Sequence, residues 1–303
     1  MAMPMYQGKT IIDTSVPLDT ESIKEKSVIV TGGAAGLGRA YVKSFVDAGA
    51  YVTFGDLNED NGHELASELP GKAQFVKCDV RSWDDQVQLF EAAVSNSPSK
   101  SCDIVIANAG ITGPDGLSAE EDIHTDPSLP PVKPDTKILD TNILGELYTT
   151  KLAIHYFRRQ PVDPKRDRCL ILMGSLSGYF DLPGSAQYSM SKFAIRALMR
   201  SLRRSSWCDS RRVNLVAPTY IPTESYPHEF LRHLKSCGIK LGQQDDACKA
   251  VMRIASDRGV NGRTLAVLSR EDCPQGYVDF AQDDYEEGTW MRDLQDTLLN
   301  LSP

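Results

Sequence analysis

Short β-branched segments alternate with longer amphipathic segments along most of this chain, and this alternation constrains the fold more than any other feature. Segments rich in Val, Ile, Leu and Phe are expected to form strands at 27–32, 51–56, 73–80, 102–110, 169–175, 212–218 and 263–269. Helical spacing of apolar residues predicts helices at 37–50, 61–71, 83–97, 136–160, 187–206 and 245–256. Strands that alternate with helices form βαβ units within a parallel sheet. The sequence therefore predicts an α/β fold, with one doubly wound parallel sheet of about seven strands and helices on both faces.

The same alternation sets the expected domain boundaries. Residues 24–269 are predicted to form a single domain, since α/β folds of this length often run as one unit. Residues 1–23 form an N-terminal extension, and residues 270–303 form an acidic C-terminal tail. The polar, Pro-rich segment 111–135 is expected to be a surface excursion, because the alternation resumes after it.

Charge and composition argue against several functional classes. A net charge of −8 is unfavourable for nucleic-acid binding, and no apolar run approaches the length of a membrane span. Seven scattered cysteines without a C-x-x-C pair favour a reducing, cytoplasmic location over a disulfide framework or a zinc site. One group of arginines is either a basic patch for an anionic partner or, as we expect, a solvated helix face: Arg196, Arg200, Arg203, Arg204, Arg211 and Arg212.

A glycine-rich segment, Thr31–Gly38, separates the first predicted strand from the first predicted helix and is called the glycine turn below. Glycines at such a turn allow tight bending, close approach of backbone N–H groups to a pyrophosphate, and close packing of helix on strand. The N-terminus of the helix then faces the phosphates. The sequence predicts a dinucleotide site here, with candidate contacts at Gly32, Ala34, Gly36, Leu37 and Gly38.

Asp56 ends the second predicted strand, about 20 residues after the glycine turn. A carboxylate at this position can accept two hydrogen bonds from an adenosine ribose diol, and it would repel a 2′-phosphate. Leu57, a further candidate contact, follows it, and neither Arg nor Lys stands in the next positions. The sequence therefore predicts NAD rather than NADP. The alternative is that Asp56 simply caps the next helix.

Two further strand ends are expected to complete the nucleotide site. Asp79 could reach the adenine amino group, and Val80 could pack on the adenine ring. Asn108, Ala109 and Gly110 close the fourth predicted strand, where small residues leave room for a ribose. All of them lie at the carboxyl ends of parallel strands, where open α/β sheets bind ligands.

Tyr188 and Lys192 lie one turn apart on a predicted helix, so their side chains share a face. A phenol is normally protonated at neutral pH, but a neighbouring ammonium favours its ionised form. Such a phenol can exchange a proton with an alcohol or a carbonyl. Ser175 follows the fifth predicted strand and could hydrogen-bond the same substrate oxygen; its spacing from Tyr188 favours it over Ser177.

This ordered set of motifs resembles the short-chain dehydrogenase/reductase family of the T-G-x-x-x-G-x-G type, over roughly residues 24–268. The resemblance implies a Rossmann-type fold and a catalytic role for four residues. Tyr188 would be the acid/base, Lys192 would bind the nicotinamide ribose, Ser175 would orient the substrate oxygen, and Asn142 would hold a proton-relay water.

The segment that begins at Pro218 resembles the family's P-G-x-x-x-T motif beside the nicotinamide. Pro218, Ile221 and Thr223 would then contact the cofactor, and Thr219 replaces the usual Gly. Residues 222–245 follow, where the family places its substrate lid. Four apolar side chains there either line a pocket for an apolar substrate or pack the lid down: Tyr226, Phe230, Leu231 and Leu234.

The chain as a whole resembles fungal dehydrogenases of secondary metabolism, which implies a secondary alcohol or ketone substrate of apolar or polyketide-like character. A reductase that uses NADPH is the alternative within the family, and a redox-silent binding protein on the same fold is the alternative outside it. The family usually pairs two long helices of each subunit, here about 138–158 and 186–206, so we expect a homodimer or homotetramer.

Overall fold

The computed structural model describes residues 6, 11–117, 130, 132–160, 167–205, 211–224 and 226–301. Most of the expected excursion at 111–135, the beginning of the N-terminal extension and Cys208 lie outside the described residues. The other six cysteines are free. Within the described ranges, no helix is both long enough and apolar enough to cross a bilayer.

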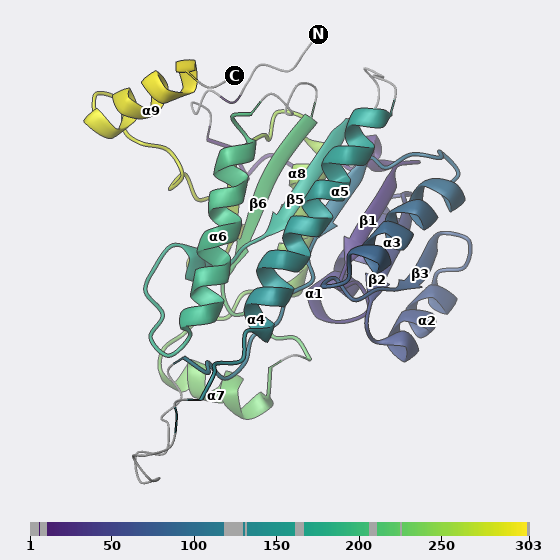
Figure 1. Ribbon diagram of the computed structural model, residues 1–303, viewed down its shortest axis with the longest axis horizontal. Helices are drawn as coiled ribbons and strands as arrows, with labels where there is room; N and C mark the ends of the chain where they lie inside the picture. The colour runs from purple at the N-terminus through teal and green to yellow at the C-terminus, as the bar shows by residue number, and fades with distance from the viewer. Residues whose placement is uncertain are drawn as a thin grey trace.

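The described residues form one sheet of eight strands in the order β3-β2-β1-β4-β5-β6-β7-β8 (Figure 1). The strands are β1 (Ser27–Thr31), β2 (Tyr51–Asp56), β3 (Ala73–Lys77), β4 (Ile104–Ala107), β5 (Arg168–Met173), β6 (Arg211–Pro218), β7 (Thr264–Val267) and β8 (Tyr277–Asp279). All neighbours are parallel except β7 and β8. Strands β2 and β3 are added on one side of β1, whereas β4 and the later strands are added on its other side. A ligand crevice is therefore expected outside the carboxyl ends of β1 and β4, where the strand order changes direction.

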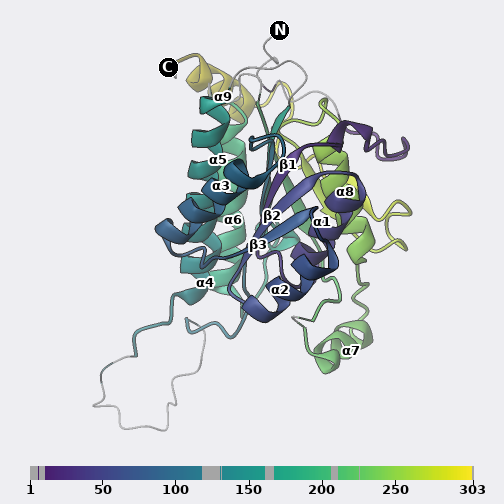
Figure 2. The ribbon, with the colours of Figure 1, turned by 90° about the vertical axis from the view of Figure 1, so that its right-hand side faces the viewer.

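Helices cover both faces of the sheet (Figure 2). The helical segments are η1 (Glu21–Ile23), α1 (Gly36–Asp47), α2 (Glu59–Glu68), α3 (Trp83–Asn96), α4 (Lys137–Leu139), η2 (Asp140–Gly145), α5 (Glu146–Arg159), η3 (Leu176–Gly178), α6 (Ala186–Leu202), α7 (His228–Ser236), α8 (Gln244–Ser256) and α9 (Trp290–Leu301). One core cluster joins α1 and α8 to one face of the sheet, and a second joins α3, α5 and α6 to the other. The doubly wound fold predicted from the sequence is therefore confirmed.

Two details of the predicted elements were wrong. The helix expected at 136–160 is interrupted by η2, a π-helical segment that separates α4 from α5. The expected tail supplies two elements that were not predicted from the sequence, the antiparallel strand β8 and the helix α9. An ion pair ties β8 to the sheet, because Arg263 Nη2 lies 2.7 Å from the Asp279 carboxylate.

The arginines of α6 and β6 do not form the solvated face expected from the sequence. Arg203 and Arg212 are fully buried. Arg203 donates to the Asp283 backbone carbonyl at 2.7 Å and to the Asp284 carboxylate at 3.1 Å. Arg196 donates to the Asp283 carboxylate at 2.7 Å. Carboxylates of the acidic tail therefore pair with arginines on α6 and at its C-terminal end.

Asp283 connects the tail to the segment that follows β5. Its carboxylate accepts hydrogen bonds from Thr264 Oγ1 at 2.6 Å, the Tyr179 hydroxyl at 2.8 Å and Arg196 Nε at 2.7 Å. Burial opposes its ionisation, but these hydrogen bonds outweigh burial and lower the pKa of Asp283. Tyr179 follows η3 directly, so the tail helps to fix the turn after the fifth strand.

Replacing Asp283 with Asn should lower the free energy of unfolding by about 2–4 kcal/mol, because it leaves Arg196 without its buried partner. Urea unfolding measures this loss. Asp293→Asn, an exposed site on α9, is the matched control and should change stability by less than about 0.5 kcal/mol. Equal stability of both variants would contradict an anchoring role for the tail.

Candidate active site

A pocket of about 870 Å³ lies at the carboxyl ends of the strands and gathers most of the residues predicted from the sequence. The predicted residues that line it are Gly32, Gly36, Leu37, Gly38, Asp56, Leu57, Asp79, Val80, Asn108, Ala109, Gly110, Ser175, Tyr188, Lys192, Pro218, Ile221 and Thr223. Ala34 and Asn142 are not among the lining residues; both are buried. The volume lies in the range of pockets that hold a cofactor or a drug-sized ligand.

Backbone conformation and close packing explain why the glycine turn has glycine at positions 33, 36 and 38. Gly36 begins α1 and has φ +52°, a conformation that other residues rarely adopt. A Cβ atom on Gly38 would lie 1.9 Å from the Gly32 carbonyl oxygen. A Cβ atom on Gly33 would lie 2.6 Å from the Cβ atom of Phe54. The N-terminus of α1 therefore packs tightly on the strand ends and faces the pocket, an arrangement that fits the pyrophosphate of a dinucleotide.

Asn108 holds this turn against β4. Its Nδ2 donates to the carbonyl oxygens of Thr31 at 2.9 Å and of Gly32 at 3.0 Å. Thr31 Oγ1 in return accepts the backbone N–H groups of Asn108 at 3.0 Å and of Ala109 at 3.1 Å. Asn108 therefore shapes the site through the backbone, a contribution that was not predicted from the sequence.

Asp56 lies at the end of β2 with its carboxylate at the pocket wall. Oδ2 accepts the Ala34 N–H at 2.9 Å, and Oδ1 accepts the Asn58 N–H at 3.0 Å. The helix-cap alternative is wrong, because Asn58 is the N-cap of α2 and accepts the Asn61 N–H at 3.1 Å. The Asp56 carboxylate is thus bound to the glycine turn, and Ala34 contributes to the site through its backbone N–H group.

Asp79 lies at the expected place but already has a partner. Arg81 donates to both carboxylate oxygens, with the shortest contact at 2.6 Å, and this hydrogen bonding lowers the pKa of Asp79. Arg81 also lines the pocket, which was missed in the sequence. An adenine amino group would therefore have to share Asp79 with this guanidinium.

The catalytic candidates meet on one wall of the pocket. Lys192 Nζ donates to the Met173 carbonyl at 2.8 Å and lies 5.6 Å from the centre of the Tyr188 ring. Ser175 Oγ lies 3.0 Å from Ser177 Oγ, and both serines line the pocket. A phenol, an ammonium and a hydroxyl thus come together from α6 and from the turn after β5.

Asn142 lies in the π-helical segment η2 and is fully buried. It accepts the Ile111 N–H at 2.8 Å and donates to the Ile111 carbonyl at 2.9 Å. Its Nδ2 also lies 3.1 Å from Ser191 Oγ. These bonds fix the strand end beside Gly110, where a Cβ atom would lie 3.7 Å from Lys192 Nζ.

Aromatic side chains form the outer wall beside Tyr188. The rings of Tyr226 and Phe230 stack with centroids 5.7 Å apart, and Tyr220 approaches both edge-on. All three line the pocket, whereas Leu231 and Leu234 do not. Burial raises the pKa of Tyr226 to about 12, and the adjacent Tyr188 and Tyr220 add to the effect. Tyr220 was missed in the sequence, although it stands within the Pro218–Thr223 motif.

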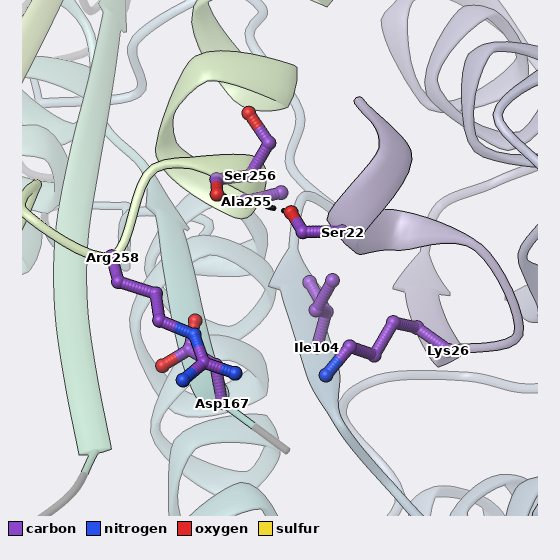
Figure 3. Close-up of a pocket in the computed structure, with 7 residues that line it drawn as sticks. All are labelled: Ser22, Lys26, Ile104, Asp167, Ala255, Ser256 and Arg258. Carbon is purple, nitrogen blue, oxygen red and sulfur yellow. Dashed lines mark hydrogen bonds between the residues drawn. The ribbon is translucent and has the colours of Figure 1, made fainter. Parts of the chain in front are cut away.

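A second, much smaller cavity is lined by seven residues (Figure 3). Its lining is Ser22, Lys26, Ile104, Asp167, Ala255, Ser256 and Arg258. Ser22 Oγ donates to the Ser256 carbonyl across it at 3.1 Å. A volume of about 10 Å³ has room for no more than one water molecule. It is a packing gap at the amino ends of the strands, far from Tyr188.

Comparison with known proteins gives consistent matches. The family model described as short chain dehydrogenase matches residues 26–230. The 5′-hydroxyaverantin dehydrogenase of Dothistroma septosporum is 34% identical over 293 residues, which cover 91% of this chain and 92% of that protein. The NADP-dependent dehydrogenase M3 of a Phoma species is 30% identical over 290 residues, which cover 90% of this chain and 84% of that protein.

Among solved structures, a 3-ketoacyl-(acyl-carrier-protein) reductase from Brucella melitensis, complexed with NADH, has a similar fold. The TM-score is 0.68 at 21% sequence identity, and the match covers 81% of this chain and 97% of that one. At this level of identity the likeness establishes the fold alone.

Replacing Gly38 with Ala should weaken NADH binding by at least about tenfold, because the new methyl group would push the Gly32 backbone out of the turn. Fluorescence titration with NADH measures this affinity. Gly116→Ala is the matched control, since a Cβ atom there makes only an ordinary contact at 3.5 Å. Unchanged binding by the Gly38 variant would rule out the glycine turn as the phosphate site.

Proposed function

The chain belongs to the short-chain dehydrogenase family of oxidoreductases, and from this premise we propose that it interconverts a secondary alcohol and a ketone with NAD as cofactor. The observation that carries the proposal is the meeting of Tyr188, Lys192 and Ser175 in the pocket that the glycine turn also lines. The glycine turn and the carboxylate of Asp56 fit the pyrophosphate and the adenosine ribose of the cofactor. A redox-silent binding protein would have no use for this set of side chains.

In the proposed reaction, Tyr188, Ser175 and Lys192 each have a different role. The bound cofactor supplies the hydride acceptor or donor. Tyr188 takes the proton from the alcohol oxygen during oxidation and returns it to the carbonyl oxygen during reduction. Ser175 holds that oxygen by a hydrogen bond. Lys192, whose Nζ donates to the Met173 carbonyl at 2.8 Å, holds its ammonium group 5.6 Å from the centre of the Tyr188 ring.

The choice of NAD over NADP rests on Asp56. Its carboxylate lines the pocket and is held in place by two backbone N–H groups. A 2′-phosphate on the adenosine ribose would meet this negative charge at close range. Some relatives, such as the Phoma dehydrogenase, are named as NADP-dependent, so NADPH-linked ketone reduction is the second candidate function. Arg81, which lines the pocket nearby, is the feature that favours it.

The aromatic wall indicates the substrate class. Tyr220, Tyr226 and Phe230 present ring faces and edges beside Tyr188, and such surfaces bind planar, multi-ring compounds well. The relative from Dothistroma septosporum is named 5′-hydroxyaverantin dehydrogenase, so its name gives an alcohol as the substrate. We infer that the substrate is an aromatic, polyketide-like secondary alcohol or its ketone.

The assembly and location that we propose follow the expectations from the sequence. Leu147 on α5 and both Met190 and Phe193 on α6 are exposed apolar residues. These helices lie on the same face of the sheet (Figure 1), which supports pairing of two subunits through them in a homodimer or homotetramer. The scattered cysteines of the sequence favour a cytoplasmic location.

Tyr188→Phe should lower kcat by about 10²–10⁴-fold and leave NAD binding within about twofold, because only the acid/base hydroxyl is lost. NADH absorbance at 340 nm measures the reaction, with 1-(2-naphthyl)ethanol as the aromatic probe and 2-butanol as the small one. Tyr148→Phe, outside the pocket, is the control. Full activity of the Tyr188 variant would disprove the assignment, and an inactive wild-type protein that binds NAD would favour the redox-silent alternative.

The wild-type protein should prefer NAD⁺ to NADP⁺ by at least about tenfold in kcat/KM, and Asp56→Ser should narrow this ratio by about tenfold. The reason is that the substitution removes the charge that repels a 2′-phosphate. Asp60→Asn, an exposed carboxylate outside the pocket, should leave the ratio unchanged. A preference for NADP⁺ in the wild type would favour the ketoreductase alternative.

A further inference from the structure

Glu146 is a buried carboxyl group behind the active site to which the proposed reaction gives no role. It is the first residue of α5, and its side chain is almost completely buried, with 3% of the residue exposed. Its Oε1 atom has no hydrogen-bond partner among the described residues. Glutamate is almost never fully buried unless it is paired, so its presence here needs an explanation.

Met173 links Glu146 to Lys192. The Met173 carbonyl accepts a hydrogen bond from Lys192 Nζ at 2.8 Å, and the Met173 backbone acts on the Glu146 carboxyl group to lower its pKa. Lys192 and Met173 line the pocket, whereas Glu146 does not. Glu146 can therefore influence the reacting atoms only through these two neighbours.

The other elements packed against this end of α5 bring no second charge to Glu146. From α6, Lys192 is the charged group that acts on the carboxyl group. Segment η2 contributes the buried neutral Asn142 and the exposed Asp140, which does not act on the pKa of Glu146. Helix α3 contributes Gln86, whose Nε2 donates to the Gly145 carbonyl at 2.8 Å. Strand β4 is apolar throughout. Among the described residues, Lys192 is thus the one charged group that acts on the pKa of this carboxyl group.

The ionisation of Glu146 is strongly perturbed. Burial raises the pKa of Glu146 from 4.5 to about 8, against the opposing effects of Lys192 and of the Met173 backbone. The carboxyl group is therefore mostly neutral at neutral pH and becomes negative in weakly alkaline solution.

We propose that Glu146 is a positioning residue that controls, through its own charge, how strongly Lys192 stabilises the phenolate of Tyr188. While Glu146 is neutral, the ammonium acts undiminished on the phenol. Once Glu146 ionises, its negative charge offsets the charge of the same ammonium. The inference rests on the proposed function, because it takes Tyr188 to be the acid/base.

The kinetic test compares the wild type with Glu146→Gln, which keeps the size of the side chain and removes its charge. The pH dependence of kcat/KM for NAD⁺-linked oxidation of 1-(2-naphthyl)ethanol should show an acid limb. In the variant, the midpoint of this limb should move to lower pH by about 0.5–1 unit, because no second anion competes for Lys192. Glu146→Met should give the same shift, and it provides a second variant if the glutamine is not tolerated.

Thr150→Val is the matched control, because Thr150 is buried one turn further along α5 and its Oγ1 also lacks a partner among the described residues. This variant should keep the wild-type midpoint. An unchanged or raised midpoint in both Glu146 variants, or an equal shift in the Thr150 variant, would overturn the proposal.

Thermal unfolding tests the titration without any substrate. Because the pKa of Glu146 is raised from 4.5 to about 8, the folded protein keeps a proton that the unfolded chain has released, and this contribution to stability is lost as the pH rises through that window. The Tm of Glu146→Gln minus the Tm of the wild type should therefore increase from pH 5 to pH 8. A constant difference would overturn the proposal. A wild type with no activity, by contrast, would refute the proposed function itself.

Discussion

The hydrogen bonds between Asn108 and the glycine turn are the contacts on which the site depends. They join the ends of β1 and β4, the two neighbours at which the sheet changes its direction of growth. Because Thr31 also receives two N–H groups from the β4 end, the turn is fixed from both sides. A fixed turn directs the N-terminus of α1 into the pocket, and that orientation is what a pyrophosphate requires.

The second half of the chain supplies the wall of the pocket that contains Ser175, Tyr188 and Lys192. The β5 end supplies Met173 and Ser175, and α6 brings Tyr188 and Lys192 alongside them. The C-terminal segment supports this wall from outside, since Asp283 holds both Tyr179 and Arg196. The C-terminal segment, which was predicted from the sequence to be an acidic tail, thus helps to stabilise the turn that carries Ser175.

Much of the fold and of the site could be predicted because it follows local rules. The alternation of strand and helix predicts a parallel sheet, and parallel strands place their carboxyl ends at one edge. Asp56 and the glycine turn are therefore predicted from the sequence to belong to one site. Strand β8 was not predicted because it has only three residues. The π-helical segment η2 was not predicted because a single π-helical turn has no distinct hydrophobic period in the sequence.

The sequence by itself determined the fold class, the edge of the sheet that carries the site, and the order of Ser175, Tyr188 and Lys192. These are set by residue type and by spacing along one segment. Only the tertiary structure decided which charges meet: Asp79 with Arg81, Asp283 with Arg196, and Asp284 with Arg203. Most of these partners lie far apart in the chain, and the energy of a charge depends on its burial and on what lies within a few ångströms of it. Neither quantity can be read from local sequence patterns.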